Sequence, residues 1–166
     1  KARDRVPAVA WEAHKNNPDR VHELKHLWAK SPQYSYKYAL NLTTLGMKLI
    51  GPPKRFPEGE PAIATSAKYS YLYALDILKP MYIKGFSLGE PAIATDAGYS
   101  YHYARDVLRP LGINGFPMGE PAIATNAMYS YHYATDVLEK RFLQGEPVIR
   151  GSNWQKYYEE EFGVKL

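Results

Sequence analysis

Cysteine is absent from this chain of 166 residues. Without thiols the protein forms neither disulfide bonds nor thiolate metal sites, and the composition is typical of a reducing compartment. Long apolar runs are absent too: no stretch approaches 18 consecutive apolar residues, so we expect no membrane-spanning helix. The first residues, Lys1 to Arg5, lack the apolar segment of a secretory signal.

Excess charge of one sign is confined to the first third of the chain. Residues 1–58 hold 11 Lys and Arg against 5 Asp and Glu, whereas residues 59–166 hold 10 against 12. A basic segment can contact phosphates or an acidic protein face, although solvated helix surfaces also carry charge this diffuse. The residues that we assign to a nucleic-acid interface, as an alternative function, are Lys25, Lys30, Lys37, Lys54 and Arg55.

Repetition is what this sequence has in abundance. The string GEPAIAT begins at Gly59, Gly89 and Gly119, and a degraded copy, GEPVIRG, begins at Gly145. Each GEPAIAT copy leads into Ala-x-Tyr-Ser-Tyr-x-Tyr-Ala-x-Asp-(Ile/Val)-Leu. A period of about 30 residues is typical of helical arrays, in which one unit cannot bury its own apolar face and stacks on a neighbour. With 45% apolar residues, we expect one folded domain over residues 1–166.

Side chains that cap helix N-termini precede each tyrosine-rich phrase. They are Ser31, Ser66, Asp96, Asn126 and Ser152. We therefore predict a long helix from about Ala67 to Leu78, repeated in the other units, with Pro80 and Pro110 ending two of them. Alternating tyrosines would also suit a strand, but the caps favour a helix. GEPAIAT predicts a short preceding helix, because its glycine suits a positive φ and its proline suits an early helical position.

The predicted fold is all-α, a helical-repeat (αα solenoid-like) array of about 30-residue units, each with a long helix, a loop and a short helix. Residues 31–150 form the repeats. Residues 1–30 are expected to cap the N-terminus with helices over 7–14 and 18–30, and residues 151–166 to cap the C-terminus with a helix over 152–162. Terminal units of arrays commonly depart from the consensus in this way.

The positions that vary between units are spaced i, i+4 and i+7 within the long helix, so they share one stripe. We expect this stripe to face outward and to bind a partner. The predicted partner-binding residues are Lys37, Lys68, Leu72, His102, Arg105, Met128, His132 and Thr135. The repeated tyrosines occupy the remaining face, which favours packing between helices over stacking on nucleic-acid bases.

One catalytic motif, His-Glu-Leu-Lys-His at residues 22–26, matches H-E-x-x-H. On a helix it would place His22 and His26 one turn apart as zinc ligands, with Glu23 activating a metal-bound water. Lys25 puts a charge inside the motif, and a third ligand would have to be a distant carboxylate such as Glu58 or Glu60. We interpret the match as accidental and predict no metal site, no cofactor and no catalytic residue.

Carboxylates recur in every repeat. Glu60, Glu90, Glu120 and Glu146 precede the proline, and Asp76, Asp106 and Asp136 lie late in the long helix. Paired carboxylates can hydrolyse glycosidic bonds. Because an active site rarely appears once per repeat, we attribute these residues to packing, capping or ion pairing.

The phrase Tyr-Ser-Tyr-His-Tyr-Ala-Arg-Asp-Val-Leu (99–108), with Gly-Phe-Pro-Met-Gly-Glu-Pro (115–121), resembles the tyrosine-rich short helical repeats of proteins encoded by tailed bacteriophages. The resemblance covers about residues 31–150. Units of that group are often shorter, and the extra residues 81–83 and 111–113 depart from it. The resemblance implies a phage accessory protein in the bacterial host cytoplasm that binds and disables host or defence factors, and no catalytic residues carry over.

Three functions from different classes are compatible with these patterns. The first is a non-enzymatic repeat protein that binds a macromolecule, above all a host or anti-phage defence protein that it inhibits. The second is RNA or DNA binding through the basic N-terminal part. The third is a zinc hydrolase. A scaffolding or virion role also stays open, since array surfaces serve either purpose.

Overall fold

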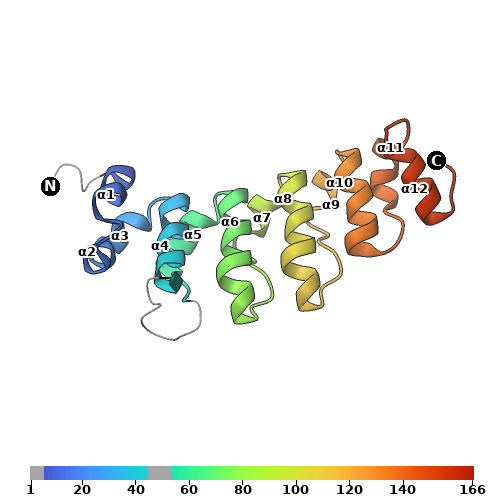
Figure 1. Ribbon diagram of the computed structural model, residues 1–166. Coiled ribbons are helices and arrows are strands. Elements are labelled where there is room, and N and C mark those ends of the chain that lie inside the picture. Colours follow the sequence, from blue (N-terminus) through green and yellow to red (C-terminus); the bar gives the residue numbers. More distant parts are fainter. Residues whose placement is uncertain (1–5, 45–53) are drawn as a thin grey trace. The chain divides into compact units, whose positions relative to one another are not determined.

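The computed structural model describes residues 6–44 and 54–166, and this part of the chain contains helices and no strand (Figure 1). The predicted all-α, helical-repeat class is confirmed. Residues 1–5 of the predicted N-terminal cap and residues 45–53 of the first repeat lie outside the described ranges. The chain folds as two compact units, Lys1–Gly89 and Glu90–Leu166.

The first unit begins with the predicted N-terminal helices. Its elements are α1 (Pro7–His14), α2 (Pro18–Glu23), α3 (Lys25–Trp28), α4 (Pro32–Thr44), the 3₁₀ turn η3 (Pro57–Gly59), α5 (Glu60–Ile63), α6 (Ala67–Tyr73), the π-helical turn η4 (Ala74–Leu78) and the 3₁₀ turn η5 (Lys79–Met81). The helix predicted over residues 18–30 is interrupted, because Leu24 has ψ of 11° and separates α2 from α3. Asn17 caps α2 as predicted, accepting a hydrogen bond from the Arg20 amide at 3.1 Å.

The second unit repeats the same pattern twice and then ends. Its elements are α7 (Glu90–Ile93), α8 (Ala97–His102), η6 (Tyr103–Leu108), η7 (Arg109–Leu111), α9 (Glu120–Ile123), α10 (Ala127–His132), η8 (Tyr133–Leu138), η9 (Leu143–Gly145), α11 (Glu146–Ile149) and α12 (Gln155–Phe162). The C-terminal helix α12 begins three residues later than predicted. Ser152 instead stabilises the preceding turn, where its hydroxyl donates to the Ile149 carbonyl at 2.6 Å.

The helix caps and the short helices follow the sequence pattern. Ser66, Asp96 and Asn126 accept hydrogen bonds from the amides three residues on, at 3.4, 2.8 and 3.1 Å. The helices α6, α8 and α10 each continue into a π-helical turn, η4, η6 and η8 respectively, whereas α4 is α-helical from Pro32 to Thr44. Proline does not cause this turn, because η8 forms where Lys140 replaces the proline found at Pro80 and Pro110.

The glycine that opens each GEPAIAT copy is needed for space and not for a positive φ, which corrects the expectation from sequence. Gly59, Gly119 and Gly145 have φ between −93° and −87°. A Cβ at Gly119 would lie 2.4 Å from Phe116 Cδ1 and 2.7 Å from Ser100 Cβ. The start of the short helix and the phenylalanine ring therefore lie too close together to leave room for a residue with a Cβ.

In each unit the core consists of aromatic and aliphatic side chains from the repeated positions. In the first unit Tyr38 meets Phe56, and Tyr73 meets Phe86, at ring-centroid distances of 4.6 and 5.2 Å and in edge-to-face geometry. In the second unit Tyr133 meets Phe142 in the same way at 5.1 Å. Such pairs stabilise by about 0.5–1.5 kcal/mol beyond the burial of their area.

Candidate binding surface

The H-E-x-x-H match does not form one continuous helical site. His22 lies in α2 and His26 in α3, on either side of the break at Leu24, and both side chains are exposed. Nδ1 of His22 lies 2.7 Å from the Tyr38 hydroxyl, so this imidazole serves packing. Across residues 6–44 and 54–166, no group of three His, Cys, Asp or Glu is placed to hold a metal ion.

The carboxylates considered as partners of that motif are already engaged. Glu58 lies 3.1 Å from the Lys25 ammonium. Glu60 accepts two hydrogen bonds from Arg55, at 2.8 and 2.7 Å, and a third from the Tyr73 hydroxyl at 2.7 Å. No carboxylate among the described residues therefore completes a zinc site with His22 and His26.

The repeated glutamates form a structural hydrogen-bond relay. In the second unit the Tyr133 hydroxyl donates to Glu120 at 2.9 Å and accepts the Phe116 amide at 2.7 Å. Tyr158 makes the same two contacts with Glu146 and Phe142, at 3.0 and 2.8 Å. The carboxylates thus satisfy buried tyrosine hydroxyls, as the packing interpretation expects.

The repeated aspartates join consecutive long helices. The Tyr36 hydroxyl donates to Asp76 at 2.6 Å in the first unit, and the Tyr101 hydroxyl donates to Asp136 at 2.5 Å in the second. Each tyrosine ring also lies against the first tyrosine of the next helix: Tyr36 against Tyr69 at 5.9 Å, and Tyr101 against Tyr129 at 5.6 Å. We call this arrangement the tyrosine–aspartate bridge.

The variable stripe of the first unit is only partly open to solvent. Lys68 is exposed, with its ammonium 5.6 Å from the centre of the Tyr69 ring, and Leu72 is half-buried. Lys37 is half-buried, with its ammonium 5.1 Å from the Tyr34 ring and 5.8 Å from the Trp11 ring. The stripe was predicted to face outward, and Lys68 does so, whereas Lys37 and Leu72 are half-buried.

The second unit gathers its variable residues into one cluster. The Arg105 guanidinium lies 5.0 Å above the Tyr101 ring and pairs with Asp106 at 2.6 Å. Nδ1 of His102 lies 3.1 Å from Arg105, and its ring lies 5.0 Å from Tyr101. The Arg105 and His102 side chains keep 38% and 37% of their surface exposed, so both are accessible to a partner.

The cluster extends to the C-terminal end of the second unit. The His132 ring lies 6.1 Å from Tyr101, 5.1 Å from Tyr131 and 5.0 Å from Trp154. Trp154 stacks on Tyr131 at 5.2 Å, and Tyr157 beside them is 54% exposed. We define the aromatic–histidine surface as the following residues, with the buried Tyr101 ring beneath them: His102, Arg105, Tyr129, Tyr131, His132, Trp154 and Tyr157.

Burial and hydrogen bonds together set the ionisation states of Tyr101 and Asp136. Burial, followed by the hydrogen bond to Asp136, raises the pKa of Tyr101 to about 12. Burial alone would raise the pKa of Asp136, but hydrogen bonds from Tyr101 and Thr135 lower it below its ordinary value. The phenol is therefore neutral and Asp136 ionised at neutral pH, and the Arg105 charge is balanced by Asp106.

Of the remaining predicted contact residues, Met128 is 37% exposed and Thr135 is half-buried, donating a hydrogen bond to Asp136 at 2.7 Å. Of the residues of the nucleic-acid alternative, two are ion-paired and two are exposed. Lys25 and Arg55 are neutralised by Glu58 and Glu60, whereas Lys30 and Lys54 are exposed.

Sequence reasoning missed the aromatic members of the surface. Tyr129 and Tyr131 repeat in every unit, so their regularity indicated packing alone. Trp154 was assigned to the C-terminal cap. The available signal was that Trp154 replaces a tyrosine-phrase residue in the last of the five units.

No helix in residues 6–44 or 54–166 combines the length and apolar character that crossing a bilayer requires. No protein-family model, no curated protein and no solved structure matches this chain. The described geometry is therefore the main guide to function.

Proposed function

We propose that this chain is a non-enzymatic helical-repeat protein that binds a protein partner through the aromatic–histidine surface. The observation that carries the proposal is the convergence of His102, Arg105 and His132, at positions that vary between repeats, on one group of aromatic rings. Within this group the Tyr101 ring is buried and supports the side chains above it, whereas Trp154 is half-buried and Tyr157 is exposed. Tyrosine, tryptophan and arginine are the residues that most often dominate binding energy at protein interfaces.

Rigidity supports the same function. The Tyr101 ring is held by its bond to Asp136 at 2.5 Å and by Arg105, whose guanidinium also bonds to Asp106. Side chains locked in one geometry lose little conformational entropy when a partner binds. A prepared surface of aromatic rings therefore suits the capture of a protein.

Charge favours protein over nucleic acid as the partner. Phosphate recognition needs several uncompensated Lys or Arg side chains. Within this surface Arg105 is paired with Asp106, and Asp136 adds a further negative charge. Because the repeats resemble those of tailed-phage proteins, we place the partner in the bacterial host, as a host or anti-phage defence protein that the chain inhibits.

The test is affinity capture from bacterial lysate with the wild-type chain and with the triple variant His102→Ser, Arg105→Gln and His132→Ser. We expect the variant to lose the captured protein while keeping its circular dichroism spectrum. The matched control is Lys140→Gln with Lys156→Gln, two exposed residues of the same unit outside the surface.

Two results would overturn this proposal. One is capture that survives the triple substitution. The other is capture that disappears after nuclease treatment and weakens steeply with salt, which would establish the nucleic-acid function instead.

A further inference from the structure

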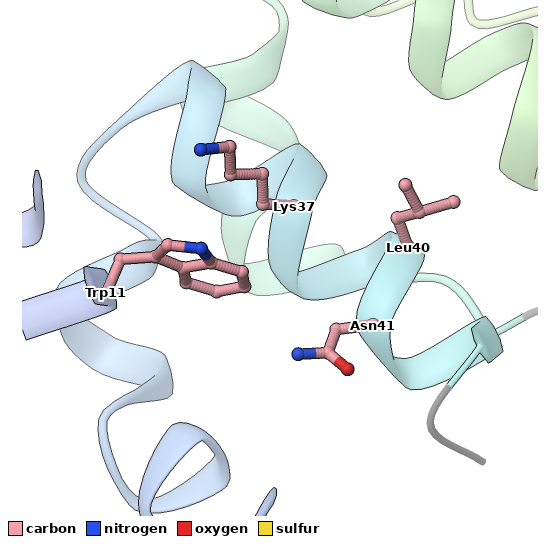
Figure 2. Close-up of a pocket in the computed structure, with 4 residues that line it drawn as sticks. All are labelled: Trp11, Lys37, Leu40 and Asn41. Atoms are coloured by element: carbon pink, nitrogen blue, oxygen red, sulfur yellow. The ribbon is translucent and has the colours of Figure 1, made fainter. Parts of the chain in front are cut away.

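A pocket of about 260 Å³ lies beside α4 in the first unit, where the short helices α1, α2 and α3 precede the first repeat. Its walls are Trp11 from α1 and Lys37, Leu40 and Asn41 from α4. Figure 2 shows Lys37 and Asn41 projecting from α4 toward the side on which the Trp11 ring lies. A space of this size is small for a cofactor and suits a single side chain.

Asn41 gives this pocket a polar group without a partner. Among the residues described, 6–44 and 54–166, its Oδ1 is the one buried side-chain nitrogen or oxygen atom that makes no hydrogen bond. A buried carbonyl without a donor destabilises the fold, so a ligand that supplies a donor removes that unfavourable contribution. Because no hydrogen bond holds Oδ1, rotation of the amide toward the pocket breaks none at that atom.

The repeat itself shows which donor belongs at this position. Asn41 occupies the place of Asp76 and Asp136, each of which accepts the hydroxyl of a tyrosine from the preceding helix. Tyr34 likewise occupies the place of Tyr69 and Tyr129, which contact the rings of those tyrosines. Beside α4 the ring position is taken by Trp11, 5.9 Å from Tyr34.

Trp11 therefore replaces the tyrosine ring and not its hydroxyl. The Trp11–Tyr34 distance equals the 5.9 Å between Tyr36 and Tyr69, with ring planes inclined at 44° and 38°. An indole in that position carries no hydroxyl for Asn41, and both residues line the pocket. At the start of the repeats, Asn41 therefore supplies the acceptor of a tyrosine–aspartate bridge, but no tyrosine hydroxyl among the described residues is present there to donate to it.

Lys37 adds affinity for an aromatic ring. Its ammonium lies 5.8 Å from the Trp11 ring centre, and it forms no ion pair within the described part of the chain. The same ammonium can attract the face of a second aromatic ring that enters the pocket beside Trp11. The pocket thus combines an aromatic wall, a cation and a hydrogen-bond acceptor.

We propose that this pocket binds a tyrosine side chain presented by a protein partner, with the phenol packed against Trp11 and its hydroxyl donated to Asn41. The identity of the presenter rests on the proposed function. The chemistry of the pocket does not, because it can be tested with a free amino-acid amide.

The experiment is an NMR titration of the whole chain with N-acetyl-tyrosinamide, and with N-acetyl-phenylalaninamide as the matched probe. We expect saturable shifts of the Trp11 indole and Asn41 amide signals, and binding of the phenylalanine probe about tenfold weaker, because a site that hydrogen-bonds a hydroxyl discriminates against its absence. Asn41→Leu should remove this preference. Asn41→Asp, the residue found at the equivalent positions, should keep it.

Equal binding of the two amides, no saturable shift up to their solubility limit, or an unchanged preference in Asn41→Leu would each overturn the proposal. Lys84→Gln, at an exposed residue of the same unit outside the pocket, serves as the control and should bind as the wild type does. If the tyrosine amide binds but Asn41→Leu captures the partner as well as the wild type, the assignment to the partner is wrong. A wild-type chain that captures nothing contradicts the proposed function and leaves the amide titration decisive for the pocket.

Discussion

At the scale of single residues, close contact explains the repetition better than chemistry does. The invariant glycine was expected to adopt a positive φ, yet its φ is ordinary and its lack of a Cβ admits the phenylalanine ring. No pattern in the sequence distinguishes these two reasons, because both demand glycine. Only the position of the Phe116 ring in space separates them.

We predict that Gly119→Ala lowers the free energy of unfolding by about 1–3 kcal/mol, because the new methyl overlaps Phe116 in a packed core. Chemical denaturation measures this change. Gly112→Asn is the control: Gly112 has φ of +80° with no atom within 4 Å of an added Cβ, and asparagine tolerates this conformation. A loss at Gly119 no larger than at Gly112 would contradict the steric explanation.

A second prediction concerns the tyrosine hydroxyls. Tyr133→Phe should destabilise the fold by about 1–3 kcal/mol, because it leaves the Phe116 amide and Glu120 without their shared partner. Tyr82→Phe, at a side chain that is 84% exposed, should be neutral by the same denaturation measurement. Equal stability of the two variants would show that the relay contributes nothing.

At the scale of helices, boundaries set by local chemistry were predictable and interruptions were not. The caps Ser66, Asp96 and Asn126 marked the long helices, because a side-chain acceptor at an N-terminus is a local signal. The break at Leu24 and the π-helical turns carry no such signal. They depend on tertiary packing, which periodicity does not encode.

The cap of α8 provides an element-scale prediction. Asp96→Ala should cost about 1 kcal/mol, because the Tyr99 amide loses its acceptor at 2.8 Å. Asp96→Asn should be close to wild type, since Asn126 caps the equivalent helix α10. Thermal unfolding followed by circular dichroism compares the two, and equal losses would refute a capping role.

At the scale of the whole molecule, the buried carboxylates and phenols predict how stability depends on pH. Hydrogen bonds to Arg141 and Tyr158 lower the pKa of Glu146 below its ordinary 4.5. Glu146 therefore contributes stability that is complete above that value and is lost as pH falls further. Burial raises the pKa of Tyr158 to about 12 from 10.0, so its contribution is lost as pH rises through that interval.

We thus expect a stability plateau near neutrality, bounded by acid and alkaline unfolding. Urea unfolding across a pH series measures the plateau, and the absorbance of tyrosinate follows the phenols directly. Tyr158→Phe should remove part of the high-pH absorbance change. If all fifteen tyrosines ionise together near pH 10 while the chain stays folded, the burial argument is wrong.

The candidate surface was harder to predict from the sequence than the fold was. His102, Arg105 and His132 were found as variable positions, but their contacts with Tyr101 and Trp154 join residues from three repeats. The pocket at Trp11 could not be predicted from the sequence for a related reason. Its meaning depends on comparing Asn41 with Asp136 in three dimensions.

The tyrosine–aspartate bridge has a consequence for how such a gene changes length. The bridge spans 35 residues in one case and 40 in the other, so it tolerates insertion in the connecting segment. A tandem duplication of about 90 base pairs, three for each residue of a 30-residue period, supplies both donor and acceptor of a new bridge at once. Gain or loss of one whole unit therefore preserves a complete set of these bonds in the remaining array, because donor and acceptor are added or removed together.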